Sequence, residues 1–268
     1  MARVAIVTGA AQGTTWVISW WVIAYAGCLN TGIGRVIALR LAKDGNDVAV
    51  NDIPSKQAEL EQLVKEIEQF GRKAIPIPGD VSKEREVQAM VQKTVDELGG
   101  LDIMVANAGF TLGFTPILEV TDEDFDRVMS TNCKGVLYCY RAAAVQMIKQ
   151  ERGGRIIGAT SAAGIRANPM NAIYSTSKFA VRAITQTAAL EWGQHNITVN
   201  AYAPGAIETP LLNERNAKDI IEMFLTGACI KRPGQPEEVA ALVGFLASEQ
   251  SSYITGQTLS VNGGILLS

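Results

Sequence analysis

The stretch "VAIVTGAAQG", residues 4–13, joins a short apolar, β-branched run to a turn that contains two glycines. In dinucleotide-binding folds the first strand turns tightly into a helix whose N-terminal amides hold a pyrophosphate, and glycines stand where a Cβ would block the backbone. Gly9 and Gly13 fit the start of such a turn, but the apolar helix that should complete it begins only at Ile33-Gly34. The stretch therefore predicts a first strand followed by a phosphate-binding loop that is cut in two.

A 19-residue segment, Thr14–Gly32, separates the two halves of this loop. An acidic residue that binds the adenosine ribose is expected about 20 residues after such a loop. Asp52 lies 39 residues after Gly13, and 20 once the segment is removed. The segment also holds three of the four tryptophans in the chain. Both observations predict a hydrophobic insertion within the cofactor loop, and a short in-frame intron retained in the message is one hypothesis for its origin.

Two consequences of the insertion stay open at the level of sequence. The loop can bulge outward and leave Gly13 adjacent to Ile33, because closing a loop of this length costs only about 2–3 kcal/mol. The apolar run Trp16–Leu29 must nevertheless pack against something, and the nearest large groove is the cofactor cleft at the carboxyl ends of the strands. The alternatives are an active nucleotide-binding form and a folded form with impaired cofactor binding, such as a splice by-product or an interaction protein.

Short apolar runs alternate with amphipathic segments along the whole chain. This pattern is typical of βαβ units and of a parallel sheet covered on both faces. Leu60, Leu63 and Ile67, for example, recur at helical spacing and form one apolar stripe. We predict one α/β domain over residues 1–268, with a Rossmann-like doubly wound sheet of seven parallel strands: Arg3–Thr8, Asp47–Asn51, Ala74–Ile77, Ile103–Ala106, Arg155–Ala159, Thr198–Tyr202 and Thr258–Val261.

Composition and charge exclude several classes of partner. The chain has 268 residues and a formal net charge of −3 with both signs spread along it, so we expect no nucleic-acid partner. The 14-residue run Trp16–Leu29 is shorter than the roughly 20 residues of a membrane span, and it lacks the basic face of an interfacial anchor. Cleavage of a secretory signal after Ala26 would remove the predicted first strand. We therefore expect a cytoplasmic protein.

Cysteine and histidine usage indicates neither disulfides nor a metal. The four cysteines form no C-x-x-C pair and are too sparse for a disulfide scaffold, which suits a reducing compartment. Cys133 and Cys139 fall on one apolar helix and are interpreted as small core residues. His195 is the only histidine, and no Cys, Asp or His lies at ligand spacing from it, so it is interpreted as a turn or surface residue.

A candidate proton-transfer pair occurs in "YSTSK", residues 174–178. Helical spacing would place the ammonium of Lys178 one turn from the phenol of Tyr174. An ammonium there stabilises the phenolate and lowers a pKa that is otherwise about 10. Ser161 follows a predicted strand and precedes Tyr174 by 13 residues. These residue types suit proton donation to the oxygen of a reducible carbon–oxygen bond.

Taken together, the motifs Thr8-Gly9…Gly13…Ile33-Gly34, "GDVS", "NAG", Asn132, Ser161, "YSTSK" and Pro204-Gly205…Thr209 resemble those of the short-chain dehydrogenases/reductases. The resemblance covers nearly everything except Thr14–Gly32. It implies an NAD(P)-dependent oxidoreductase with the catalytic residues Asn132, Ser161, Tyr174 and Lys178, in which Asn132 holds a water that links Lys178 to solvent. The cofactor-binding residues that it implies are Gly9, Gly13, Ile33, Gly34, Asp52, Asp80, Val81, Asn107, Tyr174, Lys178, Pro204, Gly205, Ile207 and Thr209.

The expected cofactor is NAD(H). The carboxylate of Asp52 can accept from both ribose hydroxyls and would repel a 2′-phosphate, although a turn residue before Pro54 is the alternative reading. Gln12 stands where family members that use the phosphorylated cofactor often carry a basic residue. The insertion leaves open that NAD is bound poorly.

The expected substrate is a small carbonyl compound or its alcohol. "VAVNDIP", residues 48–54, and the stretch 174–205 are similar to the diacetyl/acetoin (2,3-butanediol) reductases of the family, which favours diketones and hydroxyketones. We predict that Glu208–Arg232 forms a lid and that Ala162–Ile165 and Asn168–Asn171 line a small apolar pocket. The helices around Asn132–Lys149 and Tyr174–Trp192 resemble those that pair subunits in the family, so a homodimer or homotetramer is expected.

Overall fold

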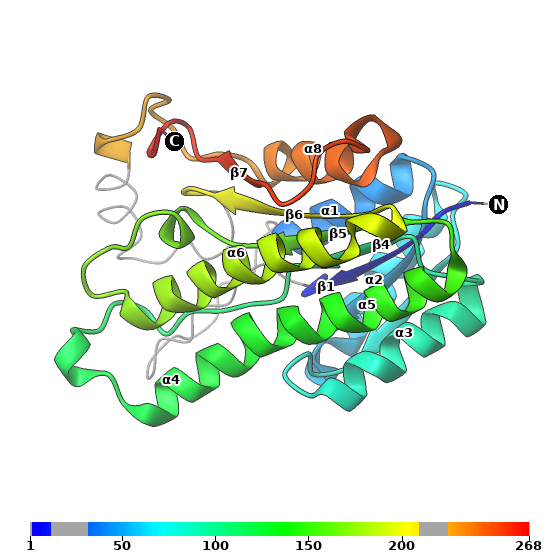
Figure 1. Cartoon of the computed structure of the whole chain (residues 1–268), viewed down its shortest axis with the longest axis horizontal. Coiled ribbons are helices and arrows are strands. Elements are labelled where there is room, and N and C mark those ends of the chain that lie inside the picture. Colours follow the sequence, from blue (N-terminus) through cyan, green and yellow to red (C-terminus); the bar gives the residue numbers. More distant parts are fainter. Residues whose placement is uncertain (1, 12–31, 209–224, 268) are drawn as a thin grey trace.

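The computed structural model describes residues 2–11, 32–208 and 225–267. Seven strands form one sheet in the order β3-β2-β1-β4-β5-β6-β7, and every neighbouring pair is parallel (Figure 1). This confirms the predicted Rossmann-like doubly wound fold. The strands are β1 (Val4–Thr8), β2 (Asp47–Asp52), β3 (Ala74–Pro78), β4 (Ile103–Ala106), β5 (Gly154–Ala159), β6 (Ile197–Pro204) and β7 (Thr258–Val261).

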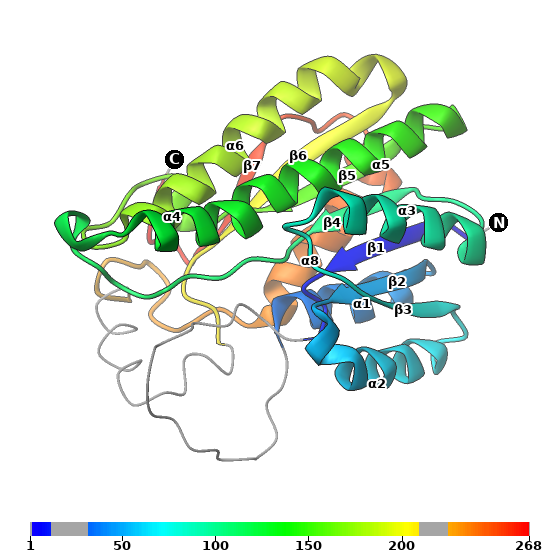
Figure 2. The ribbon, with the colours of Figure 1, turned by 90° about the horizontal axis from the view of Figure 1, so that it is seen from below.

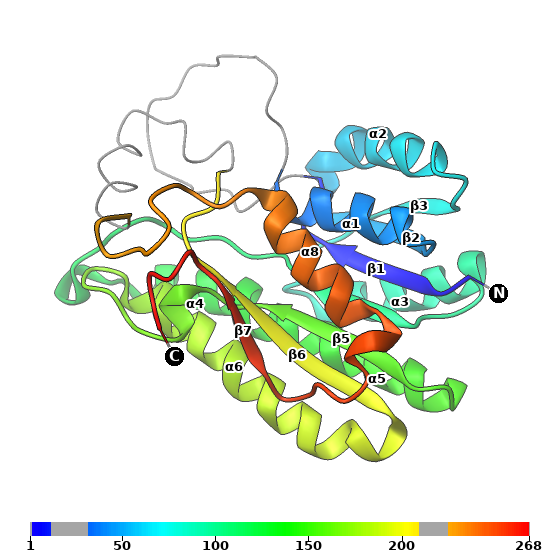
Figure 3. The same ribbon diagram turned by 90° about the horizontal axis from the view of Figure 1, so that it is seen from above.

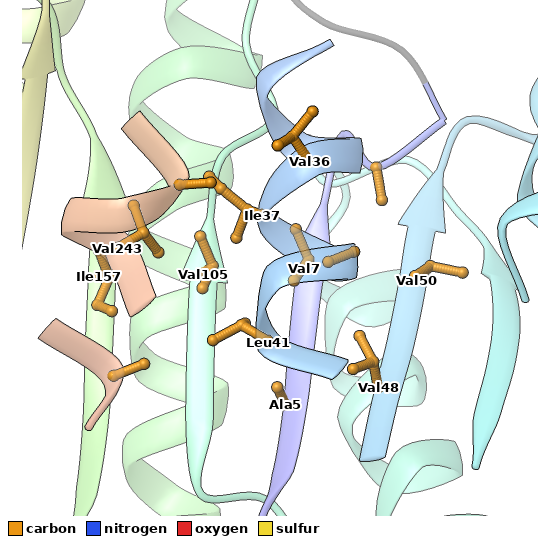
Figure 4. Close-up of a cluster of buried hydrophobic side chains, with 14 of the residues drawn as sticks. Ala5, Val7, Val36, Ile37, Leu41, Val48, Val50, Val105, Ile157 and Val243 are labelled. Carbon is orange, nitrogen blue, oxygen red and sulfur yellow. The ribbon is translucent and has the colours of Figure 1, made fainter. Parts of the chain in front are cut away.

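Helices cover both faces of the sheet (Figures 2 and 3). One face carries α1 (Ile33–Lys43), α2 (Gln57–Glu68) and α8 (Pro236–Ala247). The other carries α3 (Glu84–Leu98), α4 (Asp122–Met129), α5 (Val136–Gln150) and α6 (Ala172–Trp192). The arrangement follows from the period of the strand, because successive side chains point to opposite faces. In β1, Ala5 and Val7 pack under Ile37 and Leu41 of α1, whereas Ile6 belongs to the opposite core (Figure 4).

The observed element ends differ from the predicted ones in ways that local chemistry explains. β3 tolerates Pro76 and Pro78 because it is the edge strand, where a missing N–H breaks no central ladder. Ser82 does not cap α3, because its backbone N–H donates to Asp80 Oδ1 at 2.9 Å and the helix begins later, at Glu84. Thr121 does cap α4, because its side chain accepts from Asp124 N at 3.2 Å.

The order of the strands locates the crevice that can bind a ligand. Strand β1 lies between β2 and β4. From β1 the chain adds β2 and β3 on one side and then returns to add β4 to β7 on the other side, so the strand order reverses at this point. In open α/β sheets the carboxyl ends of the strands beside such a reversal flank the ligand crevice. Thr8, Asp52 and Ala106 end these three strands, and the residues that follow them should therefore line the site.

The structure bears on two further expectations, which concern membrane spans and cysteines. No helix within residues 2–11, 32–208 and 225–267 is long and apolar enough to span a membrane. Cys133, Cys139 and Cys229 are free thiols, while Cys28 lies outside the described residues. The cytoplasmic location stays a prediction.

Candidate active site

The two described ends of the split loop lie in direct contact. A Cβ placed on Gly34 would overlap the carbonyl oxygen of Gly9, so only a glycine at position 34 allows α1 to approach this closely. Gly9 itself has φ of +63°, a left-handed conformation that favours glycine, and a Cβ there would lie 2.9 Å from Ala108 Cα. Residues on either side of the insertion therefore meet as they would in an uninterrupted loop.

Asn107 holds the upstream half of this loop against the sheet. Its Nδ2 donates to Thr8 O at 2.8 Å and to Gly9 O at 3.2 Å, while its Oδ1 accepts from the Tyr202 hydroxyl at 2.8 Å. Burial raises the pKa of Tyr202, which keeps this hydroxyl a donor. Asn107 is among the cofactor-binding residues that the family resemblance implies, whereas Tyr202 was not predicted. The available signal was a single tyrosine in the otherwise small and apolar end of β6.

The end of β2 also holds the loop. Ala10 N donates to Asn51 O at 2.9 Å, and Ala11 N donates to Asp52 Oδ2 at 3.0 Å. Downstream, α1 begins after Gly32, with neither a side-chain cap nor an acidic residue in its first described turn. Its first amides are thus available to an anion. Gly13 and nearly all of the insertion, residues 12–31, lie outside the described residues.

A cavity of about 480 Å³ opens at the carboxyl ends of β1, β2 and β3. It brings together five of the predicted cofactor residues: Gly9, Asp52, Asp80, Val81 and Asn107.

The Gly79–Asp80 turn on its floor is held from two sides. Asn51 Nδ2 donates to Ile77 O at 2.8 Å and to Gly79 O at 3.1 Å, and Asp80 N donates to Glu86 Oε2 at 2.7 Å. Asp80 is therefore presented to the cavity by a rigid turn.

Tyr174 and Lys178 lie in the first turns of α6. The ammonium of Lys178 is buried, donates to Ala159 O at 2.9 Å and lies 5.5 Å from the centroid of the Tyr174 ring. Burial lowers the pKa of Lys178 to about 8. The predicted one-turn separation of phenol and amine is thus present.

The predicted effect on the tyrosine requires a correction. Burial raises the pKa of Tyr174, and the opposing influence is a hydrogen bond with Ser161 rather than the charge of Lys178. The physical reason is desolvation, which disfavours the phenolate just as it disfavours the ammonium. In the protein without cofactor or substrate, therefore, the pKa of the Tyr174 phenol is raised and not lowered.

Ser161 and Asn132 are held by their own local structure. Ser161 follows β5 and caps the turn Ala162–Gly164, where its Oγ accepts from Ala163 N at 3.2 Å. Asn132 lies in a π-helical turn, Ser130–Gly135, that joins α4 to α5. Its amide pairs with Phe110 N at 2.9 Å, Phe110 O at 2.7 Å and Ser177 Oγ at 3.1 Å. These three bonds use both hydrogens of the side-chain amide and one of the two acceptor sites of its oxygen.

Gly109 keeps space open between Asn132 and Lys178. A Cβ at this position would lie 3.1 Å from Asn132 Oδ1 and 3.2 Å from Lys178 Nζ. Both distances are tighter than ordinary van der Waals contact with carbon. The glycine of "NAG" is therefore a residue whose importance only the packing reveals.

The remaining predicted residues lie beyond β6. Pro204 ends that strand, and Gly205 packs against Asn262, where a Cβ would lie 2.9 Å from Asn262 Cα. Ile207 is buried and forms a bridge with Gly234. Thr209 lies outside the described residues, as does most of the predicted lid Glu208–Arg232, of which residues 209–224 are not described.

One small cavity lies beside Tyr174 in the described part of the chain. Met170, Asn171 and Tyr174 line a cavity of about 20 Å³, close to the volume that one water needs. The Oδ1 atom of Asn171 is buried and has no hydrogen-bond partner among the described residues. His195 ends a 3₁₀ turn, as expected, and no group of three metal-ligating side chains occurs in the described ranges.

Known proteins share this arrangement over most of the chain. The profile of a family described as Enoyl-(Acyl carrier protein) reductase matches residues 27–266. A short-chain dehydrogenase/reductase of Armillaria gallica is 46% identical over 270 residues, covering 98% of this chain and 96% of the relative. L-2,3-butanediol dehydrogenase of Corynebacterium glutamicum is 39% identical over 276 residues, covering 99% of each chain.

Solved structures show the same similarity. The acetoin dehydrogenase of Salmonella typhimurium superimposes with a TM-score of 0.83 at 33% identity, covering 99% of this chain and 96% of that one. A xylitol dehydrogenase solved with bound NAD+ gives a TM-score of 0.85 at 30% identity, covering 98% of both chains.

Proposed function

The chain belongs to the short-chain dehydrogenase/reductase family of oxidoreductases, and we propose that it uses NAD(H) to interconvert a small diketone or hydroxyketone and its alcohol. The observation that carries the proposal is the buried Lys178 ammonium held 5.5 Å from the Tyr174 ring, beside a loop built from Gly9 and Gly34. The similarity to a butanediol dehydrogenase and to an acetoin dehydrogenase supports the substrate class.

In the proposed reaction, different side chains donate the proton, bind the substrate oxygen and return the proton. When bound, NADH supplies the hydride to the carbonyl carbon. The Tyr174 hydroxyl donates its proton to the substrate oxygen, and Ser161 Oγ donates a hydrogen bond to that same oxygen. Lys178 then returns a proton toward the phenolate, and Asn132 holds Phe110 and Ser177 around this path. Alcohol oxidation runs the same steps in reverse.

The described residues fit a dinucleotide. Gly9 and Gly34 leave backbone where a Cβ would stand, and the uncapped start of α1 can take the pyrophosphate. Asp52, Asp80 and Val81 line a cavity large enough for the adenosine half. Pro204, Gly205 and Ile207, at the end of β6, would hold the nicotinamide half.

The contact between Gly9 and Gly34 favours the active form over the cofactor-impaired alternative. Among the described residues, the hydrogen bonds that place Gly9, Ala10 and Ala11 come from Asn51 and Asp52 of β2 and from Asn107, which follows β4. We therefore expect that removing Thr14–Gly32, with Gly13 as the junction, leaves the affinity for NADH within a few-fold of the full chain. A large gain in affinity on removal would favour the impaired form instead.

The decisive experiment is calorimetric titration of the full chain with NADH, followed by turnover assays with diacetyl and acetoin. Micromolar affinity together with diacetyl-dependent NADH oxidation supports the proposal. Absence of NADH binding to the folded chain would overturn it.

Cofactor choice gives a first specific prediction. We expect wild-type protein to bind NADH more tightly than NADPH, because the Asp52 carboxylate would repel a 2′-phosphate. Asp52→Asn should reduce this preference by roughly tenfold, which corresponds to about 1.4 kcal/mol. Dissociation constants of both nucleotides test this, with Asp44→Asn at the exposed end of α1 as a control. A wild-type preference for NADPH would contradict it.

The buried lysine gives a second prediction. With a pKa of about 8, Lys178 is protonated below that pH and neutral above it. The Tyr174–Lys178 pair must donate a proton in reduction and accept one in oxidation. Reduction should therefore slow, and oxidation accelerate, as the pH rises through about 8. Steady-state rates in both directions test this. Lys178→Arg should remove the transition, because a guanidinium stays charged; identical pH profiles in both directions would refute the assignment.

We also propose that the protein is a homodimer or homotetramer paired through α5 and α6. Large apolar side chains stand exposed on these helices: Val145 is 70% exposed and Leu190 is 87% exposed. Such a face favours burial against a second copy. Light scattering measures the assembly size directly.

A further inference from the structure

One wall of the 480 Å³ cavity carries side chains that the proposed function does not use. Phe110 follows "NAG", and Arg127, Ser130 and Thr131 come from α4 and the π turn after it. Positions 127, 130 and 131 are three and four residues apart, so they share one helical face. The carboxylates Asp52 and Asp80 line the same cavity.

Phe110 is a fixed element of this wall. Both its N–H and its carbonyl are bonded to the side chain of Asn132, at 2.9 and 2.7 Å. The guanidinium carbon of Arg127 lies 5.4 Å from the centroid of the Phe110 ring, within the range of a cation–π contact. The ring therefore positions the guanidinium at the rim of the cavity.

The guanidinium of Arg127 contacts the Phe110 ring. Within the described part of the chain, its guanidinium makes no hydrogen bond or ion pair, although Asp122, Glu123 and Asp124 occupy the first turn of the same helix. The second cation that lines the cavity, Lys56, is paired with Glu59 at 3.0 Å. Arg127 is thus a charged, planar group that stacks on a ring and leaves its donors to solvent or to a ligand.

We propose that Arg127 and Phe110 form a stacking wall for the adenine ring of the dinucleotide, with the guanidinium plane lying over the base. This inference rests on the proposed function. Asp52, Asp80 and Val81, which the proposed function assigns to the adenosine half, line this cavity, and Gly9 and Gly109 connect it to the phosphate-binding loop and to the surroundings of Lys178. Asp52 and Asp80, which line the same cavity, can accept only from hydroxyl or amino edges, which leaves the face of the base to Arg127 and Phe110.

Arginine suits this contact for a physical reason. Its guanidinium is planar and weakly hydrated, so it stacks on flat rings at little desolvation cost, whereas a lysine ammonium is a compact, strongly hydrated point charge. If the guanidinium stacks on the base, replacing Arg127 by Lys should therefore weaken nucleotide binding. A contact with a phosphate would distinguish the two much less and would weaken steeply with salt.

The test compares Arg127→Ala, Arg127→Lys and the control Arg85→Ala, an exposed arginine on α3 that does not line the cavity. Dissociation constants are measured for NADH, for ADP and for nicotinamide mononucleotide, each at low and high salt. We expect Arg127→Ala to weaken NADH and ADP binding by about tenfold. Arg127→Lys should recover little of this loss, and affinity for the mononucleotide should not change.

Two results would overturn the inference: unchanged ADP affinity in Arg127→Ala, or full recovery in Arg127→Lys with strong salt dependence. The ADP arm keeps this test separate from the proposed function. A protein that binds ADP through Arg127 but does not oxidise NADH with diacetyl would refute the substrate assignment and still support the stacking wall.

Discussion

Replacing Tyr174 by Phe is expected to lower kcat/KM for diacetyl reduction by roughly 10²–10⁴-fold, because the substitution removes the proton donor and leaves the ring in place. Binding of NADH should change little, since the stacked ring and the buried Lys178 remain. Stopped-flow or steady-state NADH oxidation measures the first effect, and calorimetric titration measures the second.

The matched control is Tyr253→Phe, which removes a hydroxyl from a fully exposed tyrosine at the amino end of the sheet. It should leave kcat/KM unchanged. If Tyr174→Phe retained wild-type turnover while binding NADH normally, the acid–base assignment of the Tyr174–Lys178 pair would fail, and a different donor would have to serve the substrate oxygen.

Replacing Gly34 by Ala is expected to weaken NADH binding by roughly 100-fold, or about 2.7 kcal/mol. The added methyl would overlap the carbonyl oxygen of Gly9, so α1 would have to move away from the loop whose amides hold the pyrophosphate. Calorimetric titration with NADH measures the affinity, and circular dichroism at the same temperature shows whether the variant is folded.

The control for this substitution is Gly193→Ala, at a glycine that has no atom within 4 Å of an added Cβ and a φ of −55°. It should bind NADH as the wild type does. A folded Gly34→Ala protein with unchanged affinity would mean that the contact across the insertion does not shape the nucleotide site. If Gly34→Ala does not fold, Gly109→Ala tests the packing around Lys178 instead, with loss of turnover expected.

Local pattern was sufficient for the fold. β1, β2 and β4 each contain a continuous apolar run, Val4–Val7, Val48–Val50 and Ile103–Ala106, because both faces of a parallel sheet are covered, and these runs are visible in sequence. Local pattern was not sufficient for the ends of the strands. β6 extends to Pro204, two residues beyond the prediction, because its pairing with β7 continues there. No local signal announces where a neighbouring strand will stop.

In the candidate site, too, some features could be predicted from sequence and others could not. Tyr174 and Lys178 could be paired from sequence because the α-helix places residues four apart on one face. The raised pKa of Tyr174 could not, since it results from burial by segments distant in sequence. Tyr202 and Arg127 were missed for a similar reason: their partners, Asn107 and Phe110, lie 95 and 17 positions away along the chain.

The sequence by itself determined the seven-stranded sheet, the family and the set of candidate residues, because short-range periodicity and motif spacing are properties of the chain. Only the tertiary structure decided that Gly9 meets Gly34 across the insertion, that Gly109 keeps room beside Lys178, and that Arg127 lies over Phe110. These contacts depend on how helices pack against the sheet, and close packing joins residues that no sequence spacing relates.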